Sequence, residues 1–251
     1  MTAPLYLLAA GALAGVSVGD DVGLQGGEGH HAATVARLAV GAPVLLADDS
    51  GWLAECCVAG VGKGSLTATV QAVTYQESPR PRFTLVQALA KADRDLLAIE
   101  VATELGVDRV IPWQADRSVV RWRGERGVKA ERKWRNTVAA ATKQARRARV
   151  PDVSALADRS ALIAHVEQAD LALVLHENAS RPLAEFTGAE LPGEGEVLLV
   201  VGPEGGITDA ELDALVTAGA RPVRLGDTLL RTSTAGSAAI ALLSALTRWR
   251  A

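Results

Sequence analysis

The sequence is poor in cysteine and contains no long apolar run. Its 251 residues include only two cysteines, the adjacent Cys56 and Cys57, which have neither the spacing of a disulfide framework nor that of a metal site. The apolar stretch from Leu5 to Val16 is too short to cross a membrane. A signal peptide would require basic residues before such a stretch, but no Lys or Arg precedes Arg37. These absences predict a reduced, cytoplasmic protein without metal or membrane partners.

Charge is distributed unevenly along the chain. The net charge is −3, yet residues 117–149 hold 12 of the 26 Lys and Arg residues and only two acidic residues. This segment therefore carries +10 and the remainder of the chain −13. A cationic face on an acidic body favours a polyanionic partner such as RNA or DNA, and a solvated helix face is the alternative interpretation.

The hydrophobic pattern changes near residue 75. Residues 1–74 alternate apolar and polar positions between frequent turn signals, which predicts a small β-barrel or sheet with one helix near Gly29–Leu38. Residues 75–82 contain Pro79 and Pro81 and predict an extended linker. From Phe83 to residue 251, strands alternate with helices, which predicts an α/β domain with a parallel sheet covered on both faces.

Local signals place several elements within residues 83–251. The apolar runs 171–175 and 197–201 predict central parallel strands. Asp93 is expected to cap a helix that ends at Gly106, and Thr208 with Glu211 forms a capping-box pattern. A long basic helix is expected over residues 128–147 and a closing helix over 234–250.

Unusual residues follow three of the expected strands, namely residues 176–178, 202–206 and 226–236. Ligands of open α/β sheets bind beyond the carboxyl ends of the strands. The loop 202–206, Gly-Pro-Glu-Gly-Gly, lacks the Lys-Ser/Thr ending of a P-loop and the dinucleotide fingerprint, and Glu204 would repel phosphate. The loop therefore predicts close approach of backbone to a neutral or cationic ligand, with a simple tight turn as the alternative.

These segments together resemble the RsmE family of 16S rRNA (uracil-N3) methyltransferases, which belongs to the SPOUT superfamily. The resemblance rests on the loop 202–206 and on residues 225–235, Leu-Gly-Asp-Thr-Leu-Leu-Arg-Thr-Ser-Thr-Ala. It extends over nearly the whole chain in the same order. Further matching segments are 29–31, 35–38, 87–91, 102–107, 117–122 and 149–153.

The resemblance implies a PUA-like RNA-binding β-barrel at residues 1–74 and a SPOUT domain at 83–251 with a C-terminal trefoil knot. It implies a homodimer that binds S-adenosyl-L-methionine in the knot and methylates N3 of a specific uridine of 16S rRNA in the 30S subunit. It also implies ten cofactor-binding residues: Leu175, Gly202, Pro203, Glu204, Gly205, Gly206, Leu225, Gly226, Leu230 and Thr234. For Leu230 ordinary core packing, and for Thr234 capping of the final helix, are the alternatives.

Transfer of a methyl group to uracil N3 requires loss of the N3 proton. The resemblance therefore also implies residues that accept this proton and stabilise the uracil anion. Arg231 is expected to stabilise the developing uracil anion, with a phosphate clamp or a dimer ion pair as the alternative. Glu204 and His176 are the candidate proton acceptors. Trp122 and Trp134 either stack on bases or belong to the core. The expected RNA contacts are Arg37, Arg117, Arg121, Arg132, Lys133, Arg135, Lys143, Arg146 and Arg147.

The chain departs from the family pattern at Thr228 and Ser233, where the family usually has Arg and Glu. Two other functions remain as alternatives. One is a SPOUT ribose 2′-O-methyltransferase of rRNA or tRNA, and the other is a ribosome-assembly factor that binds rRNA without catalysis.

Overall fold

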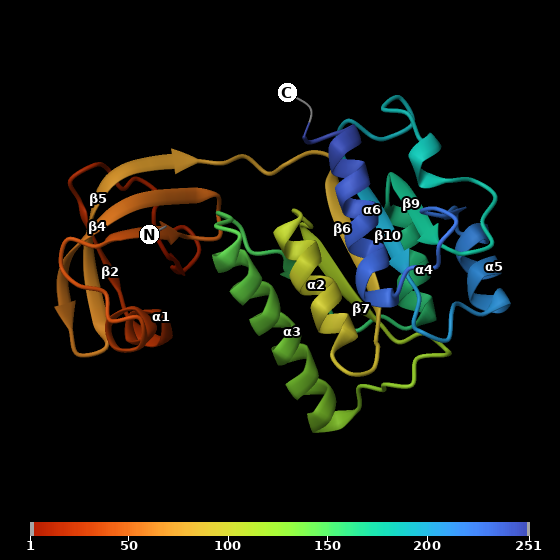
Figure 1. Ribbon diagram of the computed structural model, residues 1–251, viewed down its shortest axis with the longest axis horizontal. Helices are drawn as coiled ribbons and strands as arrows, with labels where there is room; N and C mark the ends of the chain where they lie inside the picture. The colour runs from red at the N-terminus through yellow and green to blue at the C-terminus, as the bar shows by residue number, and fades with distance from the viewer. Residues whose placement is uncertain (1–2, 250–251) are drawn as a thin grey trace. The chain divides into compact units, whose positions relative to one another are not determined.

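In a computed structural model, which describes residues 3–249, the chain folds as two compact units (Figure 1). The N-terminal unit comprises the residues up to Ser78 together with Thr142–Val150, and the C-terminal unit comprises Pro79–Ala141 and Pro151 onward. Residues 76–81 join the two parts without a helix or a strand. None of the helices within residues 3–249 is long and apolar enough to cross a membrane.

The N-terminal unit is built on a five-stranded sheet in the order β1-β3-β4-β5-β2. Only β1 and β3 pair in parallel; the other pairs are antiparallel. The strands are β1 (Leu5–Leu7), β2 (Asp21–Leu24), β3 (Pro43–Ala47), β4 (Trp52–Gly62) and β5 (Ser65–Tyr75). The pairings leave β1 and β2 at the edges, so the expected small sheet is present while its closure into a barrel stays a prediction.

Alternation along the strands explains this sheet. In β4, Ala54, Cys56 and Val58 are buried in the core, whereas Glu55 between them is exposed. The expected helix is present as α1 (Gly26–His30), which continues into a π-helical turn over His31–Val35.

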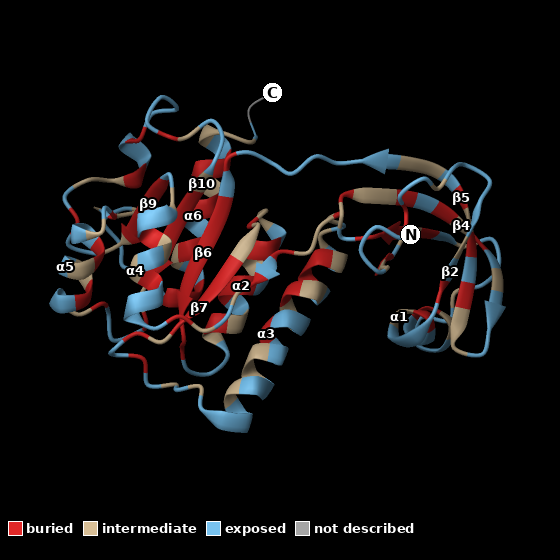
Figure 2. Ribbon diagram, turned by 180° about the vertical axis from the view of Figure 1, so that it is seen from behind, coloured by how far each residue is buried: buried red, intermediate tan, exposed pale blue. Residues whose placement is uncertain are grey.

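The C-terminal unit contains a six-stranded sheet, and all of its strands are parallel. The order is β11-β9-β10-β6-β7-β8. Its central strands are buried along their lengths (Figure 2), as expected when helices cover both faces. The strands are β6 (Arg82–Ala88), β7 (Arg109–Trp113), β8 (Asp152–Val153), β9 (Leu171–Leu175), β10 (Glu196–Val201) and β11 (Arg221–Val223).

Helices pack on both faces of this sheet, as the alternation of strands and helices predicted. On one face α2 (Arg94–Glu104) packs against α6 (Thr232–Leu246), and both contact β6. On the other, α4 (Arg159–Gln168) and α5 (Asp209–Thr217) contribute to a core cluster with Val86 and Val200. The helix α6 approaches β6 closely, because a Cβ at Gly236 would lie 2.8 Å from Leu85 Cδ1.

The helix boundaries differ from the expectations at several caps. Asp93 holds the N-cap position of α2, but its φ of 58° is left-handed and its side chain does not cap the helix. Its carboxylate instead pairs with Lys133 at 2.9 Å. The capping box of Thr208 and Glu211 is confirmed.

The long basic helix and the closing helix both begin earlier than expected. The helix α3 spans Gly124–Gln144 rather than 128–147, and Trp122, which precedes it, meets Trp134 within it edge-to-face at 5.5 Å. The helix α6 begins at Thr232, with Arg231 rather than Thr234 as its N-cap, and ends at Leu246. The predicted end at Arg250 lies outside the described residues.

Candidate functional site

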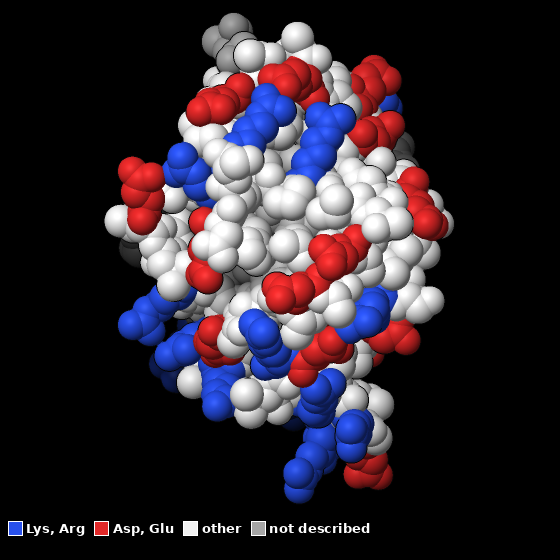
Figure 3. Space-filling view, turned by 90° about the vertical axis from the view of Figure 1, so that its right-hand side faces the viewer, with Lys and Arg blue, Asp and Glu red and all other residues white. Residues whose placement is uncertain are grey.

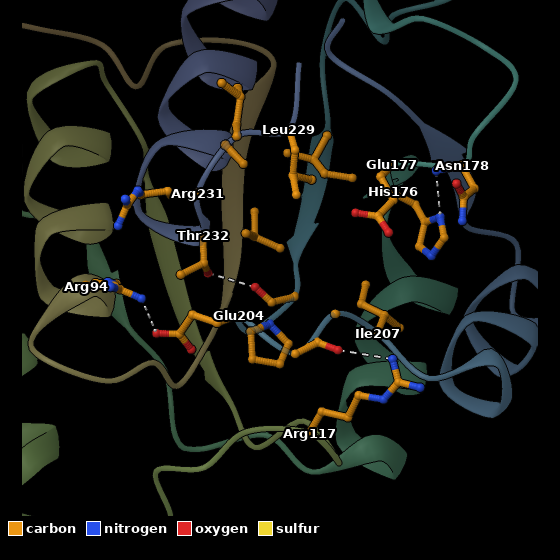
Figure 4. A pocket seen from close by; sticks show the side chains of 18 of the residues that line it. Arg94, Arg117, His176, Glu177, Asn178, Glu204, Ile207, Leu229, Arg231 and Thr232 are labelled. Atoms are coloured by element: carbon orange, nitrogen blue, oxygen red, sulfur yellow. Dashed lines mark hydrogen bonds and ion pairs between the residues drawn. The ribbon is translucent and has the colours of Figure 1, made fainter. Parts of the chain in front are cut away.

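A cavity of about 500 Å³ lies at the carboxyl ends of β9 and β10 in the C-terminal unit (Figure 4). It is lined by the segments that follow these strands and by Leu229–Thr232, at the start of α6. A second cavity of about 260 Å³, lined by the segment 223–230, shares Leu175 and Leu230 with the first. The three strand ends that the sequence singled out therefore meet at one site.

The loop Gly202–Gly206 needs glycine because its backbone is crowded. A Cβ at Gly202 would lie 2.7 Å from Ile207 Cγ1, and a Cβ at Gly205 would lie 3.1 Å from Arg117 Cβ. Gly206 has a φ of +74°, a conformation that L side chains rarely adopt. The loop therefore presents bare backbone to the cavity, as its sequence predicted.

Two arginines hold this loop from neighbouring segments. Glu204 Oε1 accepts hydrogen bonds from the Lys91 backbone N–H and from Arg94, both at 3.1 Å. Arg117 donates to the Gly205 carbonyl at 3.0 Å. The Glu204 charge is thus paired rather than isolated in the loop. Arg117, expected as an RNA contact, lies in the wall of the cavity.

A buried polar network fixes the base of the loop. Gln87 Nε2 donates to the Thr232 hydroxyl at 2.9 Å, and this hydroxyl donates to the Gly202 carbonyl at 2.7 Å. Gln87 lies at 0% exposure and pairs in register with Val201, which immediately precedes the loop. Neither side chain was singled out for this role in the sequence, because the two residues are 145 positions apart.

Arg231 lines the cavity as the N-cap residue of α6 and is exposed. Its guanidinium forms no hydrogen bond or ion pair with the residues that the structure describes. Thr234 donates its hydroxyl to the Arg231 carbonyl at 3.1 Å and lines neither cavity. The site therefore contains one free cation, at the position where the sequence placed its main catalytic candidate, within residues 3–249.

His176 also lines both cavities, and its hydrogen bond limits its chemistry. Its Nδ1 accepts from the Asn178 backbone N–H at 3.3 Å. A neutral imidazole that accepts at Nδ1 carries its proton on Nε2. His176 thus offers a hydrogen-bond donor to the cavity in this arrangement, rather than the free acceptor that a general base needs.

The remaining expected cofactor residues all reach one cavity or the other. Leu175 and Leu230 line both, and Leu230 is 37% exposed, so it is not a core residue. Leu225 and Gly226 line the smaller cavity, and Pro203 the larger. Glu177, Asn178 and Leu229 lie in the strand-end segments that the sequence singled out, although no role was assigned to them, whereas Arg94 and Asp209 were missed. The rule that ligands bind beyond the carboxyl ends of the strands, applied also to the segment after β6, would have identified Arg94.

The expected RNA contacts fall into two groups. Several are neutralised by neighbours: Lys133 pairs with Asp93, Arg135 with Glu131, and Lys143 with Glu28 at 2.7 Å. Arg121 donates to a backbone carbonyl, and Arg147 also has a partner. Arg37, Arg132 and Arg146 form no ion pair within residues 3–249.

A row of free cations follows the N-terminal part of α3. Arg123, Arg126, Lys129 and Arg132 are exposed at intervals of three residues and form no ion pair with the described residues. Lys and Arg side chains gather at the lower edge of Figure 3, at the height of this end of the helix in Figure 1. Trp134 is 1% exposed and therefore belongs to the core rather than to a base-stacking surface.

Together, the fold and the site define an α/β protein with cavities of small-molecule size at the strand ends and a second, β-rich unit. Residues 76–244 match the family model for an RNA methyltransferase domain. Residues 24–71 match the model for an RNA methyltransferase PUA domain.

Known proteins with these domains resemble the chain over most of its length. Ribosomal RNA small subunit methyltransferase E of Mycobacterium tuberculosis (strain CDC 1551 / Oshkosh) is 45% identical over 233 residues, covering 91% of this chain and 88% of the relative. The protein of that name from Bacillus subtilis (strain 168) is 30% identical, covering 88% of each. A crystal structure of the Neisseria gonorrhoeae enzyme bound to S-adenosyl methionine superposes with a TM-score of 0.84 at 25% identity, covering 98% of each chain.

The chain belongs to the family of ribosomal RNA small subunit methyltransferases E. The resemblance to the RsmE family is thereby confirmed, and the chain is an RNA methyltransferase with a PUA domain.

Proposed function

We propose that the protein transfers a methyl group from S-adenosyl-L-methionine to N3 of a uridine of 16S rRNA, uridine 1498 in the usual rRNA numbering. The observation that carries this proposal is the cavity itself, which is lined both by the glycine loop and by a free arginine, Arg231. A structure of a related enzyme is bound to S-adenosyl methionine, which supports the choice of cofactor.

The residues of the two cavities fit this cofactor. Gly202, Gly205 and Gly206 line the larger cavity without side chains, so backbone groups of the loop can approach a ligand closely. Leu175, Leu225 and Leu230 supply apolar walls for an adenine ring. The cofactor carries no phosphate and supplies the methyl group when it is bound.

Arg231 would stabilise the negative charge that develops on O2 or O4 of uracil as N3 loses its proton. An exposed guanidinium on a residue that lines the cavity suits this role, because preorganised charges aimed at a developing anion account for much of an enzyme's rate. Of the two candidate proton acceptors, Glu204 keeps Oε2 without a partner within residues 3–249, whereas the Nδ1 of His176 is occupied. We therefore retain Glu204 as the acceptor.

We also propose the finer features that the family resemblance implies. The N-terminal residues 1–74 would form a PUA-like barrel that binds rRNA, and residues 83–251 a SPOUT domain with a trefoil knot. The active form would be a homodimer in the cytoplasm that acts on the 30S subunit. The free cation row on α3 would contribute phosphate contacts.

The test is mass spectrometry of nucleosides from 16S rRNA of a strain that lacks the gene, complemented with the wild type or with Arg231→Ala. We expect 3-methyluridine to vanish on deletion and to return with the wild type but not with Arg231→Ala. Arg221→Ala is the matched control, because Arg221 is exposed at the start of β11, away from the cavity. Loss of a ribose-methylated nucleoside instead would favour 2′-O-methylation. No change in any nucleoside would favour an assembly factor.

A further inference from the structure

The Thr232 hydroxyl lies between two groups that come from different strands. It accepts from Gln87 Nε2 at 2.9 Å and donates to the Gly202 carbonyl at 2.7 Å. Gln87 is fully buried, and Thr232 is 7% exposed. The proton of this hydroxyl and one of its two lone pairs are thus used inside the protein.

These bonds connect the two halves of the candidate site. Gly202 opens the glycine loop, where the cofactor is proposed to bind, and Thr232 directly follows Arg231. Figure 4 shows Thr232 beneath Arg231 with its bond directed at the loop. One hydroxyl therefore joins the glycine loop to the start of α6.

The helix itself does not use this hydroxyl. Arg231 is the N-cap of α6, and no side chain caps the helix at that position. Gln87 Oε1 has no hydrogen-bond partner among the described residues, and such a buried unsatisfied atom is costly. An apolar side chain at position 87 would fill the same space without that cost. The Gln87 amide therefore contributes to the structure through its hydrogen bonds to the Thr232 hydroxyl and to the Ala88 carbonyl.

We propose that Thr232 is a positioning residue that sets the distance between the methyl donor and the target base, an inference that rests on the proposed function. Group transfer depends on near-attack geometry, and a misplacement of about 1 Å can cost about 100-fold in rate. Loss of the hydroxyl would let the glycine loop shift relative to Arg231. It would remove no group proposed to touch the cofactor or the base.

Thr232→Val and Thr232→Ser test this role, because valine keeps the shape and serine keeps the hydroxyl. The measurements are kcat on 30S subunits and on 16S rRNA, the Kd of S-adenosylhomocysteine, and Tm. We expect Thr232→Val to lower kcat at least about tenfold while the Kd changes less than about threefold. Thr232→Ser should stay within about threefold of the wild type in both. Thr217→Val is the matched control, since among residues 3–249 the exposed Thr217 hydroxyl bonds only to the Asp213 carbonyl of its own helix.

Gln87→Met provides a second variant in case Thr232→Val folds poorly. It removes the donor to Thr232 together with the unpartnered oxygen, so we expect it to fold and to lower kcat less than Thr232→Val does. The double variant should match Thr232→Val in kcat, because both changes act through one network.

Three results would overturn the positioning role. They are an unchanged kcat in both Thr232→Val and Gln87→Met, a Thr232→Ser variant as slow as Thr232→Val, and a loss of S-adenosylhomocysteine binding that accounts for the whole loss of activity. The wild type tests the proposed function separately. A wild type that transfers no methyl group overturns the function together with this inference. An active wild type with equally active Thr232→Val and Gln87→Met variants overturns the inference alone.

Discussion

The guanidinium of Arg94 and the carboxylate of Glu204 meet at 3.1 Å, although 110 positions separate them in the chain. Arg94 opens α2, and Glu204 lies in the glycine loop after β10. Their contact follows from the sheet order, in which β10 and β6 are neighbours. Together with the Arg117 bond to Gly205, it holds the loop from two sides.

Removal of this ion pair should weaken cofactor binding more than it weakens the fold. The two side chains are 38% and 29% exposed, and such pairs add only about 0–1 kcal/mol to stability. We expect Arg94→Met to raise the Kd of S-adenosylhomocysteine roughly tenfold, equivalent to about 1.4 kcal/mol, and to lower Tm by no more than about 4 °C. Calorimetric titration and thermal unfolding measure the two effects.

Arg80→Met is the matched control for this prediction. Arg80 pairs with Glu194 at 2.9 Å, but the two side chains are 61% and 79% exposed and lie outside the cavity. Arg80→Met should leave the Kd of S-adenosylhomocysteine unchanged. Equal effects of the two substitutions would mean that the Arg94 pair does not shape the loop.

The free cations on α3 should account for more of the salt dependence of rRNA binding than the paired ones. Arg126 is exposed without an ion pair within residues 3–249, whereas Lys143 is 25% exposed and pairs with Glu28. In a plot of log Kobs against log salt, we expect Arg126→Gln to reduce the slope by about 1. Lys143→Gln should reduce it less. A larger effect of Lys143→Gln on this slope would mean that the RNA does not bind at the free cations of α3.

The ion pair of Glu190 should make the loop between β9 and β10 sensitive to acid. Hydrogen bonds from Arg181 and from the Thr187 backbone N–H lower the pKa of Glu190 from 4.5 to about 2. A carboxylate with a lowered pKa in the folded state stabilises that state above the unfolded pKa. This contribution is lost as the pH falls from about 4.5 to about 2.

The measurement is the Tm of the wild type and of Glu190→Gln as a function of pH. We expect the difference in Tm to be constant above about pH 5.5 and to vanish near pH 2. Glu185→Gln serves as the control, because Glu185 is on the same loop and its carboxylate forms no hydrogen bond or ion pair with the described residues. A difference that persists unchanged at pH 2 would contradict the role of the Glu190 charge.

The two cysteines should differ in reactivity although they are adjacent. Burial raises the pKa of Cys56 to about 11, so only about 1 in 1,000 of its thiols is ionised at pH 8. Cys57 is on the opposite face of β4 and half-buried. Iodoacetamide at pH 8 should therefore modify Cys57 first, as peptide mass spectrometry would show, and modify Cys56 readily only in denaturant. Faster modification of Cys56 in the native protein would contradict its burial.

Part of the site could be predicted because its signals are local. The glycines of the loop 202–206 and the capping box at Thr208 are visible in consecutive residues, and the rule that ligands bind at strand ends then brings Leu175, Gly202 and Leu225 together. The position of Arg231 at the cavity followed from the same rule. Asp93 was placed correctly at the N-cap of α2, but its carboxylate pairs with Lys133 and does not cap the helix. Thr234 as the cap of the closing helix was wrong, because that helix begins at Thr232.

The sequence by itself determined the order of strands and helices, the change of architecture near residue 75 and the glycine loop, since apolar periodicity and backbone-permissive residues act over a few positions. Only the tertiary structure decided which charges are free and which are paired, and that Gln87, Gly202 and Thr232 share one network. Those contacts join residues up to 145 positions apart. They depend on the order of the strands in the sheet, which the periodicity of the individual strands does not specify.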